Sequence, residues 1–199
     1  MTIRSGEDWG SDVEGVPPDA VISTSDVFTA QCVARGLQVV VRGGSLHDAL
    51  GGPSGTPSRV LPVDLVTIED ASGATVVQTI GTLTVRRSYS LGGLWGRVVI
   101  VSNTGHLDRY TPCPAAHPND GMFDVLEADA SMSLRQRLVA RRRAQAGAHL
   151  PHPLLRVTRH TEYAFEVHTG ERLVCERGVV VGPGRFRAVI EIDAGNVFV

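Results

Sequence analysis

Short apolar runs rich in β-branched residues, separated by polar turns, fill most of the chain from about residue 60 onward. Runs of this kind that are bounded by Gly, Asp or Asn are typical of β-strands. Nine of them predict an antiparallel sandwich or a barrel-like sheet. They read RVLPVDLVTIED, ATVVQTIGTLTVRR, GRVVIVSN, MFDVLEAD, LLRVTRH, YAFEVHT, ERLVCE, FRAVIEID and NVFV.

Helical patterns are few. SMSLRQRLVARRRAQAG predicts one helix among the strands, capped by Ser131 or Ser133 and ended by Gly147. Nearer the N-terminus, AVIST and LQVVVR predict two strands around the helix SDVFTAQCVARG, with Ser25 as its cap and Gly36 at its end. This order is a short βαβ unit.

The pattern therefore predicts a mainly β (α+β) protein in three parts. Residues 1–19 contain five acidic residues and one arginine, and we expect a flexible acidic leader. Residues 20–58 form a reduced α/β segment. Residues 59–199 form the antiparallel sandwich with one packed helix.

Composition narrows the function classes. A net charge of −2 gives no reason to expect a nucleic-acid partner. No apolar run approaches the roughly 20 residues that span a bilayer, and the start of the chain does not resemble a signal peptide, so we expect a cytoplasmic protein with at most peripheral membrane contact. All 19 basic residues are arginine, which excludes lysine-dependent chemistry.

The stretch HPNDGMFDV, residues 117–125, places Asn119, Asp120 and Gly121 in a row and a second aspartate, Asp124, four residues after the first. These residue types favour a tight turn. A turn with several oxygen ligands also suits Mg²⁺ or Ca²⁺, with Asp120 as the candidate ligand. Both interpretations remain open.

Two other groups invite a functional interpretation. His149 and His152 have a spacing that ligates zinc on a helix, but the neighbouring Pro151 and the absence of a third ligand nearby favour a structural turn. The arginines of the expected helix would attract anionic lipid. They point all around the axis, however, which favours a solvated, partly packed helix. They are Arg135, Arg137, Arg141, Arg142 and Arg143.

The order of two motifs resembles the soluble diacylglycerol kinase family, which includes sphingosine and ceramide kinases. The first is the turn and strand formed here by Asp120, Gly121, Asp124 and Val125. The second is the end of the helix, with Gly147, His149, His152 and Pro153. The similarity runs from about Leu61 to Val199. It implies a two-domain lipid kinase that binds ATP in an N-terminal α/β domain and transfers phosphate to a lipid hydroxyl, with the sandwich contributing to the lipid cleft and the magnesium network.

The chain departs from this family pattern in two places. Gly43, Gly44 and Ser45 resemble a shortened phosphate loop whose Asp-Gly-Thr is replaced by Ser45 alone, so ATP binding is doubtful. The family's Val-Asp-Gly-Glu turn, which supplies a carboxylate to the lipid hydroxyl, falls on Cys175, Glu176 and Arg177. Glu176 is the only candidate catalytic residue, and it requires a register shift of one residue.

Three functions follow from these observations. The first is a diacylglycerol kinase-like protein that binds a lipid and lacks autonomous kinase activity. The second is an ATP- and Mg²⁺-dependent lipid kinase whose nucleotide site is completed by another chain or a homodimer mate. The third is an oligomeric interaction module that uses exposed sheet edges.

Overall fold

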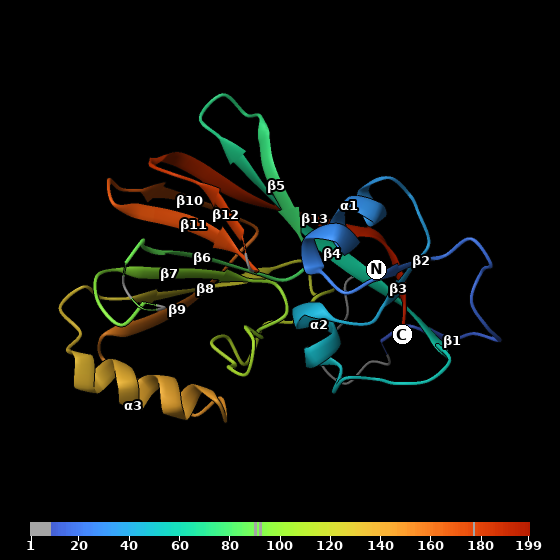
Figure 1. Ribbon diagram of the computed structural model, residues 1–199, viewed down its shortest axis with the longest axis horizontal. Coiled ribbons are helices and arrows are strands. Elements are labelled where there is room, and N and C mark those ends of the chain that lie inside the picture. The colour runs from blue at the N-terminus through green and yellow to red at the C-terminus, as the bar shows by residue number, and fades with distance from the viewer. Residues whose placement is uncertain (1–8, 90, 92, 177) are drawn as a thin grey trace.

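Two β-sheets stacked face to face form the larger part of the molecule (Figure 1). The computed structural model describes residues 9–89, 91, 93–176 and 178–199. The antiparallel sandwich expected from the strand pattern is confirmed, because one sheet is wholly antiparallel and its strands follow the order β12-β11-β6-β7-β8-β9. Its strands are β6 (Thr82–Arg87), β7 (Val98–Ser102), β8 (Phe123–Ala128), β9 (Leu155–His160), β11 (Glu171–Cys175) and β12 (Gly178–Val181). We call it sheet B.

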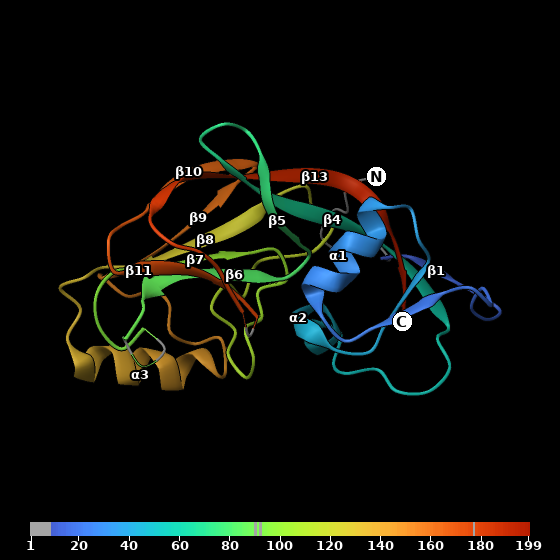
Figure 2. The same cartoon turned by 45° about the horizontal axis from the view of Figure 1, so that its top comes forward.

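The other sheet, sheet A, follows the order β1-β4-β13-β3-β2, with β5 added beside β4 and β10 beside β13. Its two long strands, β4 and β13, pair antiparallel and extend beyond the sandwich toward the N-terminal segment (Figure 2). The strands are β1 (Ser11–Asp12), β2 (Val21–Ser23), β3 (Val39–Val41), β4 (Arg59–Asp70), β5 (Thr75–Thr79), β10 (Glu162–Val167) and β13 (Gly184–Phe198).

The sandwich core consists of the side chains that alternate inward from both sheets. Burying one such Val, Leu, Ile or Phe side chain stabilises the fold by roughly 1.5–3 kcal/mol. The core includes Val66, Ile68, Leu83, Val99, Phe123, Val125, Phe165, Leu173 and Phe186.

The N-terminal βαβ unit is also confirmed. Strands β2 and β3 are parallel, and α1 (Asp26–Ala34) connects them. Ser25 caps α1, since its hydroxyl accepts a hydrogen bond from the amide of Phe28 at 3.2 Å. Strand β3 also pairs in parallel with β13, so this unit continues sheet A. A short helix, α2 (Gly44–Ala49), follows β3.

Helix α3 (Leu134–Ala144) lies on the face of sheet B that points away from sheet A (Figure 2). Ser133 and Gln136 form a reciprocal capping box at its start, so the second of the two expected N-caps is the one used. A small apolar cluster between α3 and sheet B includes Ile100, Cys113, Leu126 and Ala128.

Two boundaries in the strand pattern were wrong. ATVVQTIGTLTVRR was expected as one strand, but it divides at Ile80 and Gly81 into β5 of sheet A and β6 of sheet B. FRAVIEID and NVFV were expected as two strands separated by a turn, but they form the single strand β13. The reason is a register shift against β4 between Glu191 and Gly195, where Asp193 has a φ of 50°. An irregularity of this kind lets a strand continue through residues that resemble a turn.

The expected leader is described only from Trp9 onward. The indole of Trp9 donates to the carbonyl of Pro62 at 2.9 Å, and Ser11–Asp12 pair with Arg59 and Val60. This part of the leader is therefore anchored to β4. Among the described residues, no helix has the length and apolar character needed to cross a membrane.

Candidate functional site

The N-terminus of α1 brings together candidate residues from distant parts of the chain. The carboxylate of Glu176, from the turn between β11 and β12, accepts hydrogen bonds from the backbone amides of Asp26 and Val27 and from the hydroxyl of Ser25. The two amides are among the backbone donors that lack an intrahelical acceptor at the start of a helix. Glu176 therefore serves as a helix cap across about 150 residues of sequence.

Asp26 lies beside this cap and is almost fully buried. Its carboxylate accepts hydrogen bonds from the amide and the hydroxyl of Ser45, at 2.8 and 2.7 Å, and from the amide of Leu46 at 3.3 Å. The Ser45 proton is used in this way, so the hydroxyl of Thr104, 2.8 Å away, donates to Ser45. Burial raises the pKa of Asp26 above its ordinary value, the hydrogen bonds oppose this, and the charge of Glu176 adds to the increase.

Glycine is required around this carboxylate. A β-carbon at Gly81 would overlap the carboxylate of Asp26 and the hydroxyl of Ser45, and one at Gly44, where φ is 88°, would overlap Asp26 as well.

A polar pocket of about 460 Å³ opens beside the Asp26 carboxylate and is lined by Asp26, Ser45, Asp48, Asp108 and Glu176, among others.

The expected phosphate loop is thus bonded internally. The Ser45 and Leu46 amides, which would cradle a phosphate, both bind Asp26. The structure places Gly44, Ser45 and Glu176 in one pocket, but it does not present a free ring of amides there. Arg177 lies outside the described residues.

The Asn119–Asp120–Gly121 turn lies elsewhere, against β4 and β13. Buried Asp64 of β4 holds it, because its carboxylate accepts hydrogen bonds from the Gly121 amide at 2.8 Å, the Asp193 amide at 2.9 Å and the Asn119 side chain at 3.3 Å. The backbone amide of Asp64 also donates to the carbonyl of Pro118 at 2.7 Å. Burial raises the pKa of Asp64.

Asp120 in this turn and Asp124 in β8 both form ion pairs with one arginine. Arg159 of β9 forms ion pairs with Asp120 and, through Nε at 3.3 Å, with Asp124. The Asp124 side chain is only 1% exposed, and burial raises its pKa to about 6 against the opposing charge of Arg159. Within the described ranges, no group of three or more His, Cys, Asp or Glu side chains is placed to hold a metal ion. Cation binding at Asp120 therefore stays a prediction, and it requires the release of Arg159.

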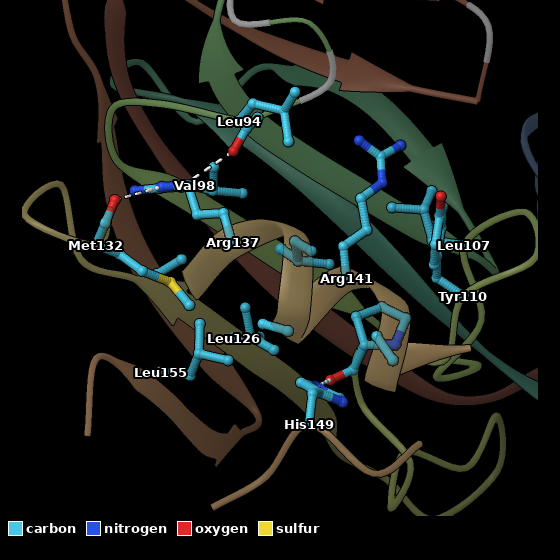
Figure 3. Close-up of a pocket in the computed structure, with 16 residues that line it drawn as sticks. Leu94, Val98, Leu107, Tyr110, Leu126, Met132, Arg137, Arg141, His149 and Leu155 are labelled. Carbon is cyan, nitrogen blue, oxygen red and sulfur yellow. Dashed lines mark hydrogen bonds between the residues drawn. The ribbon is translucent and has the colours of Figure 1, made fainter. Parts of the chain in front are cut away.

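An apolar cavity of about 150 Å³ lies between α3 and sheet B (Figure 3). Val98, Ile100, Leu126 and Leu155 line its sheet side, and Ala140 and Ala144 line its helix side. No carboxylate is among the described residues that line it. The cavity is thus apolar inside and carries no negative charge on its wall.

Four polar side chains also line the cavity: Tyr110, Arg137, Arg141 and His149. The guanidinium of Arg137 donates to the carbonyls of Gly93, Gly96, Asp129 and Met132 at 2.5–3.0 Å. Arg141 lies over the Tyr110 ring at 4.8 Å.

His149 belongs to the second family motif. Its Nε2 bonds the carbonyl of Pro112 at 2.9 Å, so Nε2 carries the proton and Nδ1 is an acceptor. Nδ1 has no hydrogen-bond partner in the part of the chain that the structure describes, and burial lowers the pKa of the ring. His152 instead accepts a hydrogen bond at Nδ1 from the amide of Leu154. The two histidines therefore have separate structural partners.

Comparisons with known proteins agree with this architecture. The sequence matches no protein-family model and no curated protein. Solved structures do match, including a diacylglycerol kinase from Bacillus anthracis str. Sterne with a TM-score of 0.59, 13% identity, and coverage of 90% of this chain and 75% of that one. The chain has the fold of a diacylglycerol kinase. Two further structures of a provisionally named diacylglycerol kinase from the same strain match at TM-scores of 0.59 and 0.61, each with 10% identity and covering 90% of this chain and 77% of the other.

The structural match extends into the N-terminal segment, beyond the part of the chain where the sequence motifs lie. Leu61–Val199, where the sequence motifs lie, is only about 70% of the 199 residues, whereas the structural match covers 90%. Much of the segment before Leu61 therefore belongs to the shared diacylglycerol kinase fold. This agrees with the pairing of β3 with β13.

Proposed function

We propose that the chain is a diacylglycerol kinase-like protein that binds a lipid-like molecule and lacks autonomous kinase activity. The observation that carries this proposal is the apolar cavity between α3 and sheet B. Apolar pockets with a few polar groups at defined positions are typical of small-molecule sites. The similarity of fold to diacylglycerol kinases supports a lipid as the ligand.

The cavity suits one part of an amphiphile. A volume of about 150 Å³ accommodates a benzene-sized group, roughly six carbon atoms of a chain. Tyr110 and Arg141 offer a hydroxyl and a cation to a polar or anionic headgroup. The ligand class is therefore an amphiphile with a short apolar section inside and a hydroxyl or anionic group at the edge.

The absence of autonomous kinase activity is inferred from the α1 pocket. Phosphoryl transfer depends on charge neutralisation around the phosphates. In this chain the amides of Ser45 and Leu46 bind Asp26, and the carboxylate of Glu176 occupies the start of α1, where it would repel a phosphate.

Lipid binding is tested with an environment-sensitive fluorescent fatty acid and the purified full chain. Ala140→Phe fills the cavity, whereas Ala146→Phe adds the same bulk at an exposed position just beyond α3. We expect saturable binding that Ala140→Phe weakens at least tenfold and Ala146→Phe leaves unchanged. Absence of binding, or equal loss in both variants, would overturn the proposal.

The alternative is a lipid kinase whose nucleotide site is completed by another chain. The polar pocket of about 460 Å³ beside Asp26 and Glu176 favours it, since it is open and large enough for part of a polar ligand. Transfer of labelled γ-phosphate from ATP with Mg²⁺ to a panel of diacylglycerol, sphingoid and polyprenol lipids tests it, with an active lipid kinase as positive control. Transfer that survives repurification and is lost in Glu176→Gln would replace the first proposal with this one.

A further inference from the structure

The side chains of α3 separate into an inward and an outward set. Arg137 and Ala144 are buried against the body of the protein, and Arg141 packs on Tyr110. The outward set combines three apolar residues that are each about half exposed, at 48%, 50% and 45%, with three exposed arginines. They are Leu134, Leu138, Val139, Arg135, Arg142 and Arg143, and we call them the outer face of α3.

From the sequence, the arginines point all around the helix axis, and the structure shows that not all of them are on the exposed side. Five arginines distributed around the helix axis are unsuited to a membrane surface. Two of the five, Arg137 and Arg141, have partners within the fold, with four carbonyls and an aromatic ring respectively. The other three are exposed and lie on the outward side of the helix.

The charge of the outer face has one sign. Helix α3 contains no acidic residue. Within the described residues, none of Arg135, Arg142 and Arg143 forms an ion pair. Unpaired arginines beside exposed leucines match the phosphates and the apolar boundary of an anionic bilayer, with arginine stems lying along the apolar surface.

The position of α3 leaves this face accessible. The helix forms the outermost layer on one side of sheet B (Figures 1 and 2). Residues 93–96, which precede β7, form a segment that lies beside it, because Arg137 donates to the carbonyls of Gly93 and Gly96. That segment exposes 42% of Trp95, and Trp is a residue type enriched at membrane interfaces.

The small volume of the cavity also favours a membrane as the partner of the outer face. It holds roughly six carbon atoms, so most of a long-chain lipid would remain outside it. Helix α3 is the wall between the cavity and the outer face, and a helix with its side chains is about 10 Å thick. A bilayer against the outer face would therefore lie within reach of a lipid that is partly held in the cavity.

We infer that the outer face of α3 is a docking surface for an anionic lipid bilayer. This inference deepens the proposed lipid binding by naming where the lipid is met. Docking depends on surface residues only, whereas capture depends on the cavity, so the two can fail separately.

The test is co-sedimentation of the full chain with vesicles of phosphatidylcholine and phosphatidylglycerol, compared with vesicles of phosphatidylcholine alone. The variant Arg135→Gln/Arg142→Gln/Arg143→Gln removes the basic part of the outer face. The control Arg35→Gln/Arg172→Gln/Arg185→Gln makes the same change of net charge at three exposed positions on other elements. Far-UV circular dichroism checks that both are folded.

We expect binding to the anionic vesicles only, weakened by added salt. Each arginine near such a surface contributes about 1 kcal/mol, so the α3 triple variant should lose roughly a hundredfold in partitioning, and the control should keep its binding. Leu134→Ser/Leu138→Ser should also bind more weakly. The inference is overturned if the wild-type chain does not bind, or if both triple variants lose binding equally.

The cavity variant separates this inference from the proposed function. Ala140→Phe should bind the fluorescent fatty acid at least tenfold more weakly and still sediment with anionic vesicles. Fatty-acid binding without vesicle binding would overturn the docking surface and leave the lipid cavity standing. Vesicle binding without fatty-acid binding would overturn the lipid cavity and leave the docking surface standing.

Discussion

The backbone amide of Asp26 donates to the carboxylate of Glu176, and this contact joins the first helix to the β11–β12 turn of sheet B. Glu176 adopts a φ of 47°, which is uncommon for a residue with a side chain, and this conformation places the carboxylate at the helix start. The residue that the family pattern offers as a catalytic candidate thus has a structural function in this chain as well.

Replacing Glu176 tests that function. Glu176→Gln keeps the size of the side chain but removes the charge that interacts with the helix dipole and three donors. We expect the free energy of unfolding, measured by urea denaturation, to fall by about 1 kcal/mol. Glu191→Gln, at an exposed position of β13, is the control and should change it by less than about 0.5 kcal/mol. Equal effects in the two variants would show that the cap contributes nothing.

Local signals predicted most of the elements. Ser25 caps its helix as the sequence indicated, and Ser133 is one of the two caps expected for the other helix, because capping depends on residues within one turn. The error at β13 also arises from a local signal. Asp193 and Gly195 resemble a turn, but the strand continues through them because it pairs with β4 on both sides of the irregularity.

The site was less predictable for a different reason. Asp26 bonds Ser45 across 19 residues and Glu176 across 150, and Asp64 bonds the Gly121 amide across 57. No spacing rule connects such positions, because the arrangement of the strands brings them together. Asp26 and Asp64 were therefore missed, although an acidic residue directly after the N-cap Ser25 was visible in the sequence.

Arg137 is the buried cation on which the position of α3 depends. Arg137→Met leaves an apolar side chain of similar length but removes the donors from four carbonyls. We expect a loss of about 3–5 kcal/mol in unfolding free energy, because four carbonyls lose a charged donor and each buried acceptor left unpaired costs about 1–3 kcal/mol. Arg135→Met, two residues earlier on the exposed side of the helix, should lie within about 0.5 kcal/mol of the wild type. Comparable losses would show that the helix, and not the buried guanidinium, determines the effect.

Asp124 should make stability depend on pH. Its pKa is raised from 3.8 to about 6 in the fold, so between these values the native state binds more protons than the unfolded state. Stability therefore falls as the pH rises from about 4 to about 6, by at most about 3 kcal/mol. Melting temperatures measured across this window should show the decline in the wild type and a flatter profile in Asp124→Asn. Parallel profiles would show that Asp124 titrates near its ordinary value.

Arg159 stands between the Asp120 turn and any divalent cation. Arg159→Gln leaves Asp120 and Asp124 without their shared positive partner, which should destabilise the turn and free oxygen ligands of the kind that Ca²⁺ and Mg²⁺ prefer. We expect the melting temperature of this variant to rise by several degrees when Ca²⁺ is added, and by more than that of the wild type. Arg156→Gln, an exposed arginine on the same strand, is the matched control and should respond as the wild type does. If neither Ca²⁺ nor Mg²⁺ shifts the melting temperature of Arg159→Gln, Asp120 is a turn residue only. Its carboxylate then serves to accept a hydrogen bond from the Met122 amide at 3.1 Å and to pair with Arg159.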